Sequence, residues 1–281
     1  MSVTVTLHIY SGRPDPAWEL TDQQAAELAD KIKRVNKTTM LKPPGVVGGL
    51  GYRGFSIDAV REKNLDPSIY LHAGIIDLDR FDANRVTDTP DIEEWLLSTA
   101  GTAVDKLAKE YIDAEIKGNK RFKMTPTDGL SLMVAGPPPF DPGKWNNDEN
   151  IRRRNNCYNY ANDKITNTFA QPGRGSGAMF SAITCSDVGA AAQRDGQVPV
   201  ASASSTPAQG QFIALVIWPG SDYHWYRLDN NAMWSHKPGQ TPAKNTDNSG
   251  NLISSPETCD RGPYTDFCRY FHCIPANTNI S

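Results

Sequence analysis

The first residues of the chain show a strand-like pattern followed by a helix-like one. In residues 2–10 the apolar side chains recur at every second position, which is typical of a strand with one buried face. After a break rich in Gly and Pro, Thr21 and Gln24 occupy the N-cap and N3 positions of a capping box, so a helix should begin here. Its inward face is expected to consist of Ala25, Leu28, Ile32 and Val35.

Strand-like and helix-like patterns continue to follow one another up to about residue 120. Residues 52–57 and 68–76 have the composition of strands. Thr89-Pro90 opens another helical pattern, with Pro at the first helical position. Its apolar stripe is Ile92, Trp95, Leu96, Ala100, Val104, Leu107 and Tyr111. These elements predict a small N-terminal α+β domain over residues 1–123.

The pattern changes at residue 124. Residues 124–150 contain the run GPPPFDPGKW, whose prolines favour an extended backbone, and are predicted to be a linker. A second domain is expected over residues 151–281. Its helices are predicted at 158–169 and 178–193, its strands at 211–218, 222–229 and 232–236, and its tail is read as loops. The predicted class of the whole chain is α+β.

Two histidines lie in one predicted hairpin. With a two-residue turn at Asn230-Asn231, His236 falls opposite residue 225, one position from His224. The two imidazoles share a face if the hairpin contains a bulge or a slightly longer loop. Such a contact matters because a catalytic imidazole needs a partner that fixes its tautomer and direction.

Composition and charge exclude several classes. The 281 residues carry 29 Lys and Arg against 32 Asp and Glu, a net charge of −3, which does not favour a nucleic-acid partner. No apolar run approaches the roughly 20 residues of a membrane span. The first residues lack the pattern of a signal peptide, so a cytoplasmic location, a removed signal and another export route all stay open.

All five cysteines lie in the second half of the chain. The odd count leaves at least one thiol free if the others pair within the chain. Oxidation is expected to join Cys185, Cys259, Cys268 and Cys273 and to leave Cys157 free; five reduced thiols are the alternative.

Cys157 stands at the predicted start of a helix. There the helix dipole and the free N–H groups favour the reactive thiolate and can hold an oxyanion beside it. A Cys on a helix start, a His on a later strand and a polar orienting group on the next strand are the parts of an acyl-transfer cysteine enzyme.

This order resembles the NlpC-type cysteine peptidases, in which the second His also follows 12 residues after the first, and "NCYNYAND" is similar to the CHAP amidases. The resemblance covers residues 150–240 and implies a papain-like domain that cleaves peptidoglycan peptides. It implies Cys157 as nucleophile, His224 as base and His236 as orienting residue, with no cofactor. Residues 1–123 lie outside the resemblance, and we expect them to form a recognition or regulatory module.

Other roles and functions stay open. Asn155 and Asn156 are candidates for capping the helix or lining the oxyanion pocket, and Asp222 and Asp229 for placing the base. Cys157, His224, His236 and Asp247 form an alternative zinc set, although the spacing matches no compact motif. The rival functions are a transglutaminase- or deamidase-like toxin acting on host protein and a non-enzymatic, disulfide-stapled binding protein. The oligomeric state is not predicted.

Overall fold

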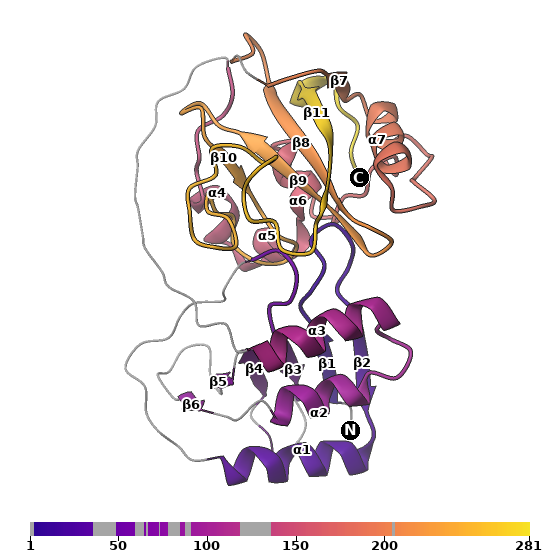
Figure 1. The fold of residues 1–281 in the computed structure, drawn as a ribbon, viewed down its shortest axis with the longest axis vertical. Coiled ribbons are helices and arrows are strands. Elements are labelled where there is room, and N and C mark those ends of the chain that lie inside the picture. The colour runs from indigo at the N-terminus through magenta and orange to yellow at the C-terminus, as the bar shows by residue number, and fades with distance from the viewer. Residues whose placement is uncertain are drawn as a thin grey trace. The chain divides into compact units, whose positions relative to one another are not determined.

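A computed structural model describes residues 3–35, 49–59, 65, 67–72, 74–77, 85–87, 91–118, 136–203 and 206–281. This part of the chain is mixed α and β with antiparallel sheets, in agreement with the predicted α+β class (Figure 1). The chain divides into two compact units. Unit 1 comprises Met1–Ile9, Asp15–Val47 and Tyr52–Phe122; unit 2 comprises Tyr10–Pro14, Gly48–Gly51 and Lys123–Ser281. Among the described helices, none has the length and apolarity to cross a membrane.

Unit 1 is built on a six-stranded antiparallel sheet of order β2-β1-β3-β4-β5-β6. Its strands are β1 (Val3–Leu7), β2 (Ala17–Leu20), β3 (Phe55–Asp58), β4 (Ser68–His72), β5 (Ile75–Asp77) and β6 (Arg85–Thr87). The predicted strand at 68–76 is thus two strands, because Gly74 turns the chain with φ +72°. Alternate side chains of the sheet are buried, among them Val5, Ile57 and Leu71.

In the described part of unit 1, three helices accompany this sheet: α1 (Asp22–Arg34), α2 (Asp91–Thr99) and α3 (Lys106–Gly118). The predicted capping box is present at Thr21, and Ala25 and Leu28 are buried as expected. The stripe predicted for one helix after Pro90 belongs to two helices, because the chain leaves α2 through Gly101 at φ +51°. Leu107, expected inside, is 49% exposed. Thr89-Pro90 lies outside the described residues.

Unit 2 contains a five-stranded antiparallel sheet of order β10-β9-β8-β11-β7. The strands are β7 (Val198–Val200), β8 (Gln211–Trp218), β9 (Asp222–Leu228), β10 (Trp234–His236) and β11 (Asp266–Cys273). β11, which pairs with β8 and β7, lies in the tail predicted to be loops. The tail's cysteines predicted a stapled loop, whereas the run FCRYFHC pairs with residues 211–216 of β8.

The helices of unit 2 are α4 (Gly143–Asn146), α5 (Glu149–Arg154), α6 (Cys157–Ala161) and α7 (Cys185–Arg194), with a 3-10 turn at Pro275–Asn277. The second part of the predicted linker is therefore folded, and Trp145 is buried against Tyr160 and Ala243. The helix predicted over 158–169 ends at Ala161. Beyond it, Asp163, Asn167 and Phe169 adopt positive φ, which a helix does not accommodate.

The hairpin of β9 and β10 has a longer connection than predicted. Trp234 pairs with Leu228 and His236 pairs with Tyr226, one position from the expected register. Ala232 adopts φ +61° within this connection. Because side chains alternate along a strand, the shift places His224 and His236 on the same face of the sheet.

Candidate active site

The imidazoles of His224 and His236 are in contact inside unit 2. His224 Nε2 lies 2.8 Å from His236 Nδ1, and His236 Nε2 lies 3.0 Å from the carbonyl oxygen of Thr246. A carbonyl only accepts, so His236 carries its proton on Nε2. When His236 is neutral, its Nδ1 is an acceptor and His224 must donate from Nε2. His236 and Thr246 thus fix the tautomer of His224, the task predicted for the orienting residue.

The surroundings keep His236 neutral. Burial, and after it the positive charge of Lys244, hold the pKa of His236 well below its usual range. The ring of His236 is stacked on Tyr226 at 5.0 Å, and the ring of His224 lies edge-on to Tyr226 and Tyr264. Both histidines are fully buried. The pair is therefore rigidly held and enclosed.

Cys157 is the first residue of α6, and Asn156 caps this helix. The Asn156 side chain accepts from the N–H groups of Tyr158 and Asn159, and Asn159 completes a capping box. The thiol is fully buried in a cluster that includes Tyr223 and Trp225. Burial, and after it the charge of Asp222, raise the pKa of the Cys157 thiol well above its usual range. The predicted dipole effect is outweighed, since α6 has only five residues and the thiol is out of water.

The position of Cys157 relative to His224 follows from β9. Tyr223 and Trp225 point to the face that packs against Cys157, and His224 leaves the strand on the other face. A hydrogen bond between the backbone of Trp225 and the thiol holds Cys157 beside the strand, one residue from His224. The Cys157 thiol and the His224 imidazole therefore lie on opposite faces of β9.

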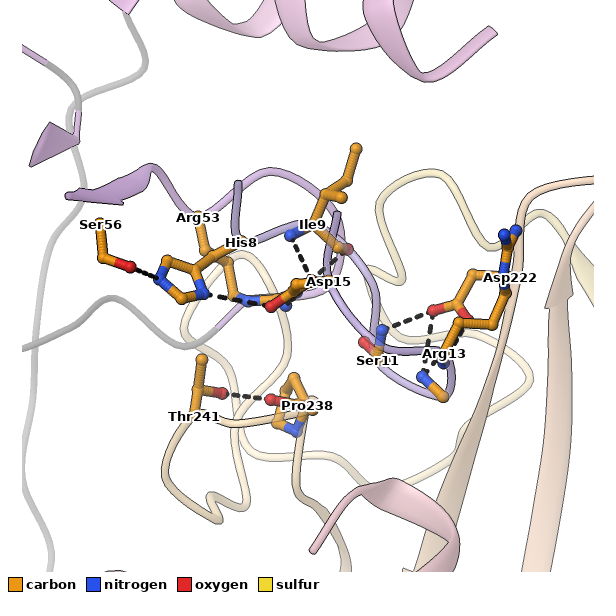
Figure 2. A network of polar contacts seen from close by, with 12 residues as sticks. His8, Ile9, Ser11, Arg13, Asp15, Arg53, Ser56, Asp222, Pro238 and Thr241 are labelled. Atoms are coloured by element: carbon orange, nitrogen blue, oxygen red, sulfur yellow. Dashed lines mark hydrogen bonds and ion pairs between the residues drawn. The ribbon is translucent and has the colours of Figure 1, made fainter. Parts of the chain in front are cut away.

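Of the four residues predicted to cap the helix, line the oxyanion pocket or place the base, Asn156 caps α6 as predicted, and all four have further partners. Asn155 binds the backbone N–H groups of Thr166 and Asn167. Asn156 donates to the carbonyl oxygens of Gly12 and Ala170. The Asp222 carboxylate accepts from three backbone N–H groups of the segment Ser11–Arg13 and from the Tyr264 hydroxyl, as Figure 2 shows in part. Asp229 pairs with Arg227 at 2.9 Å.

Several polar residues near Cys157 were not singled out in the sequence. The Lys237 ammonium is fully buried and donates to the carbonyl oxygens of Arg152, Asn155 and Gly239. Gln171 and Tyr223 donate to the carbonyl oxygen of Gly12. The only sequence signal for Lys237 and Tyr223 is that each is next to a predicted catalytic histidine. No sequence signal indicates that Gln171 belongs to the site.

The cysteines form one disulfide, between Cys185 at the start of α7 and Cys268 on β11. Cys157 is free, as predicted, but Cys259 and Cys273 are also free, against the expectation that they pair. Cys273 is buried near Gln211 and Asn162, and the half-buried Cys259 lies by the Tyr226 hydroxyl. As for the alternative zinc set, no group of three or more His, Cys, Asp or Glu residues within the described ranges is arranged to hold a metal ion.

Unit 1 holds a separate polar network, shown in Figure 2. His8 Nε2 lies 3.0 Å from the Ser56 hydroxyl and His8 Nδ1 lies 3.1 Å from the Asp15 carboxylate. Asp15 also accepts from the N–H of Ile9, and the fully buried guanidinium of Arg53 lies 3.6 Å away. Although burial raises it, the hydrogen bond from His8 and the charge of Arg53 bring the pKa of Asp15 below its usual value. The network ties together the adjacent ends of β1, β2 and β3.

Comparison with known proteins gives one informative relative. No family model matches the chain, and no solved structure matches it. Insoluble matrix shell protein 1 of Ruditapes philippinarum is 55% identical over 130 residues, which are 46% of this chain and 84% of that protein. Identity at this level over most of a protein's length reflects common descent, and the chain belongs to the family of insoluble matrix shell protein 1.

Proposed function

We propose that unit 2 is a cysteine hydrolase that cleaves an amide bond through an acyl-enzyme on Cys157. The observation that carries the proposal is the contact of His224 with His236 at 2.8 Å. Together with the Thr246 carbonyl, it prepares an imidazole whose Nδ1 is an acceptor, as a general base requires. The proposal includes a papain-like arrangement of α6 and the sheet, which the order of Cys157, His224 and His236 favours.

The chemistry follows from these groups. His224 Nδ1 takes the proton of the Cys157 thiol, and the thiolate sulfur attacks the carbonyl carbon of the amide. The C–N bond breaks as the imidazolium returns the proton to the leaving amine, and a thioester stays on Cys157. Water, deprotonated by His224, then releases the acid and restores the thiol. A cell-wall peptide is the first substrate class to assay and a protein is the second.

The described state is a resting one for this chemistry. The thiol is covered, and burial favours its uncharged form. The proposed enzyme therefore needs an opening that exposes Cys157 to substrate and brings it to His224.

The direct test is to trap the acyl-enzyme. Peptide thioesters and amides are incubated with the chain, quenched in acid, and the digest is searched for an acyl group on Cys157. The proposal expects acylation at Cys157 in the wild type and none there in His224→Ala. Acylation spread equally over Cys157, Cys259 and Cys273 would show ordinary thiol chemistry and contradict the proposal. With a primary amine added as acceptor, a new amide formed in place of the acid would favour the transglutaminase-like rival.

A second candidate is a non-enzymatic structural protein of an extracellular matrix. It is favoured by the relative, whose name places it in the insoluble matrix of a shell, and by the disulfide between Cys185 and Cys268. Under this function the chain should be retained in an insoluble matrix equally well with Cys157 intact or replaced by Ala, and trapping should find no acylated Cys157.

A further inference from the structure

The segment Ser11–Arg13 is held by its backbone as a bound peptide would be. The Asp222 carboxylate accepts from the N–H of Ser11 at 2.5 Å, of Gly12 at 3.1 Å and of Arg13 at 3.0 Å (Figure 2). The carbonyl oxygen of Ser11 accepts from the N–H of Gly239 at 3.1 Å. All of these contacts are made to backbone N–H and C=O groups. They could therefore bind any peptide whose backbone adopted the same conformation at this position.

The carbonyl oxygen of Gly12 is the most heavily bound group of the segment. It accepts from the Asn156 amide at 2.9 Å, the Gln171 amide at 2.8 Å and the Tyr223 hydroxyl at 3.1 Å. All three donors are buried side chains. Their convergence on one oxygen is a built site for a peptide carbonyl. The second N–H groups of the two amides bind the carbonyl oxygen of Ala170, and the Tyr223 hydroxyl has Gln171 Oε1 as its other acceptor.

This site adjoins the proposed nucleophile. Asn156 precedes Cys157 in the chain, and Asp222 and Tyr223 precede His224. Burial, and after it the charge of Asp222, raise the pKa of the Cys157 thiol. Burial, and after it the charges of Cys157 and Asp222, raise the pKa of Tyr223. The groups that hold Ser11–Arg13 are thus the neighbours of the groups proposed to perform the chemistry.

The position of Gly12 excludes a side chain. A Cβ there would lie 2.4 Å from the Tyr223 ring and 2.6 Å from the Tyr223 backbone oxygen. The backbone oxygen belongs to β9 and cannot move aside without breaking the sheet. Only glycine fits.

We propose that Asn156, Gln171, Asp222 and Tyr223 form a peptide-binding subsite beside Cys157. This subsite is specific for glycine and is occupied by the chain's own Ser11–Arg13. This inference rests on the proposed function, because it names the substrate class of the same site: a peptide with glycine at the position of Gly12. The segment acts as an internal pseudosubstrate, and its release admits the substrate.

The test uses Gly12→Ala in the full chain, with Gly136→Ala as the matched control. An added methyl at Gly136 meets its nearest atom at an ordinary 3.6 Å. Two quantities are measured: hydrogen exchange of the peptide that contains residues 11–13, and the rate at which iodoacetamide alkylates Cys157, with buried Cys273 as internal reference. In Gly12→Ala, exchange and Cys157 alkylation should both rise by about tenfold or more, because the clash displaces the segment. Gly136→Ala should match the wild type.

Added peptides test the subsite itself. The pentapeptide of residues 10–14 should slow Cys157 alkylation in Gly12→Ala back toward the wild-type rate, and the same peptide with Ala in place of Gly should not. Unchanged exchange in Gly12→Ala would overturn the exclusion of side chains. Faster exchange without faster Cys157 alkylation, or equal protection by both peptides, would overturn the subsite.

The proposed function fails in a different way. If Gly12→Ala uncovers Cys157 and the glycine peptide protects it, but no acyl-enzyme is ever trapped, the subsite stands as a peptide-binding site and the hydrolase is rejected.

Discussion

At the scale of single residues, the contact between His224 and His236 is the most specific feature of the candidate site. It was predicted from spacing alone, with the condition that the hairpin loop be longer than two residues, and the pairing of His236 with Tyr226 meets that condition. The partners of Asn156 and Asp222 were not predictable. Both bind Ser11–Arg13, more than 140 positions away in the chain, and no local pattern reports such contacts.

Cys157→Ala should abolish hydrolysis and leave the fold intact. The change removes the nucleophile and leaves a space of only one sulfur atom, so its effect on the free energy of unfolding should be about 1 kcal/mol. Turnover and circular dichroism are measured together. Cys273→Ala is the control, because it removes another buried thiol of unit 2 and should keep full turnover. Full turnover in a folded Cys157→Ala protein would refute the mechanism.

His224→Ala should cost more activity than His236→Ala. His224 moves the proton, and acid–base catalysis is worth about 10²–10⁴-fold, whereas His236 fixes its tautomer. His236→Asn should retain more activity than His236→Ala, since its amide oxygen can still accept the proton of His224 Nε2. The values of kcat are compared after circular dichroism has established folding. An active His224→Ala with an inactive His236→Ala would reverse the assignment.

The buried His236 should make stability depend on pH. Its pKa is depressed in the folded state, so below the unfolded value of about 6.5 the unfolded chain binds a proton that the folded chain does not. The contribution of His236 is therefore full above pH 6.5, and stability should fall as pH decreases below it, by up to about 1.4 kcal/mol per pH unit. Urea unfolding at pH 7.5 and pH 5.5 measures this. The decrease should be smaller in His236→Asn, and an equal decrease in both proteins would assign it to other groups.

At the scale of elements, strands with clear patterns were predicted well and interruptions were not. The predicted strand 211–218 is β8 without change, because a continuous apolar run between loops has few alternatives. The predicted helix after Pro90 became α2 and α3, since an apolar stripe does not reveal that Gly101 takes φ +51°. β11 was not predicted because FCRYFHC lacks the strict alternation of a half-buried strand, and its cysteines were interpreted as part of a disulfide-stapled tail.

The disulfide joins α7 to the sheet and should stabilise unit 2. Cys185 and Cys268 are 83 positions apart, and a bridge that closes a long loop typically contributes about 2–4 kcal/mol. Replacing both residues by Ser should lower the free energy of unfolding by this amount in urea. Cys259→Ser, which removes a free thiol, should change it by much less. A non-reduced digest without the peptide linked through Cys185 and Cys268 would contradict the assignment.

At the scale of the whole molecule, the membership of each unit could not be predicted from the sequence. That Tyr10–Pro14 belongs to unit 2 was not predictable, because this assignment depends on contacts with Asp222 and Tyr223. Under the proposed function, release of this segment would open the site to substrate and expose the Cys157 thiol.

The central claim is that His224 activates Cys157, and the pH dependence of Cys157 alkylation tests it most directly. Iodoacetamide labelling is followed at Cys157 by peptide mass spectrometry from pH 5.5 to 9.5, in the wild type and in His224→Ala. The pH dependence of the alkylation rate reports the ionisation of the Cys157 thiol in the open state, in which it reacts. The frequency of opening scales the whole profile but does not change its shape. With an imidazole partner, the wild-type rate should stay nearly level below pH 7, and His224→Ala should lose about tenfold per pH unit there. If the alkylation rate falls by about tenfold per pH unit below pH 7 in both proteins, as for an ordinary thiol, the account is contradicted.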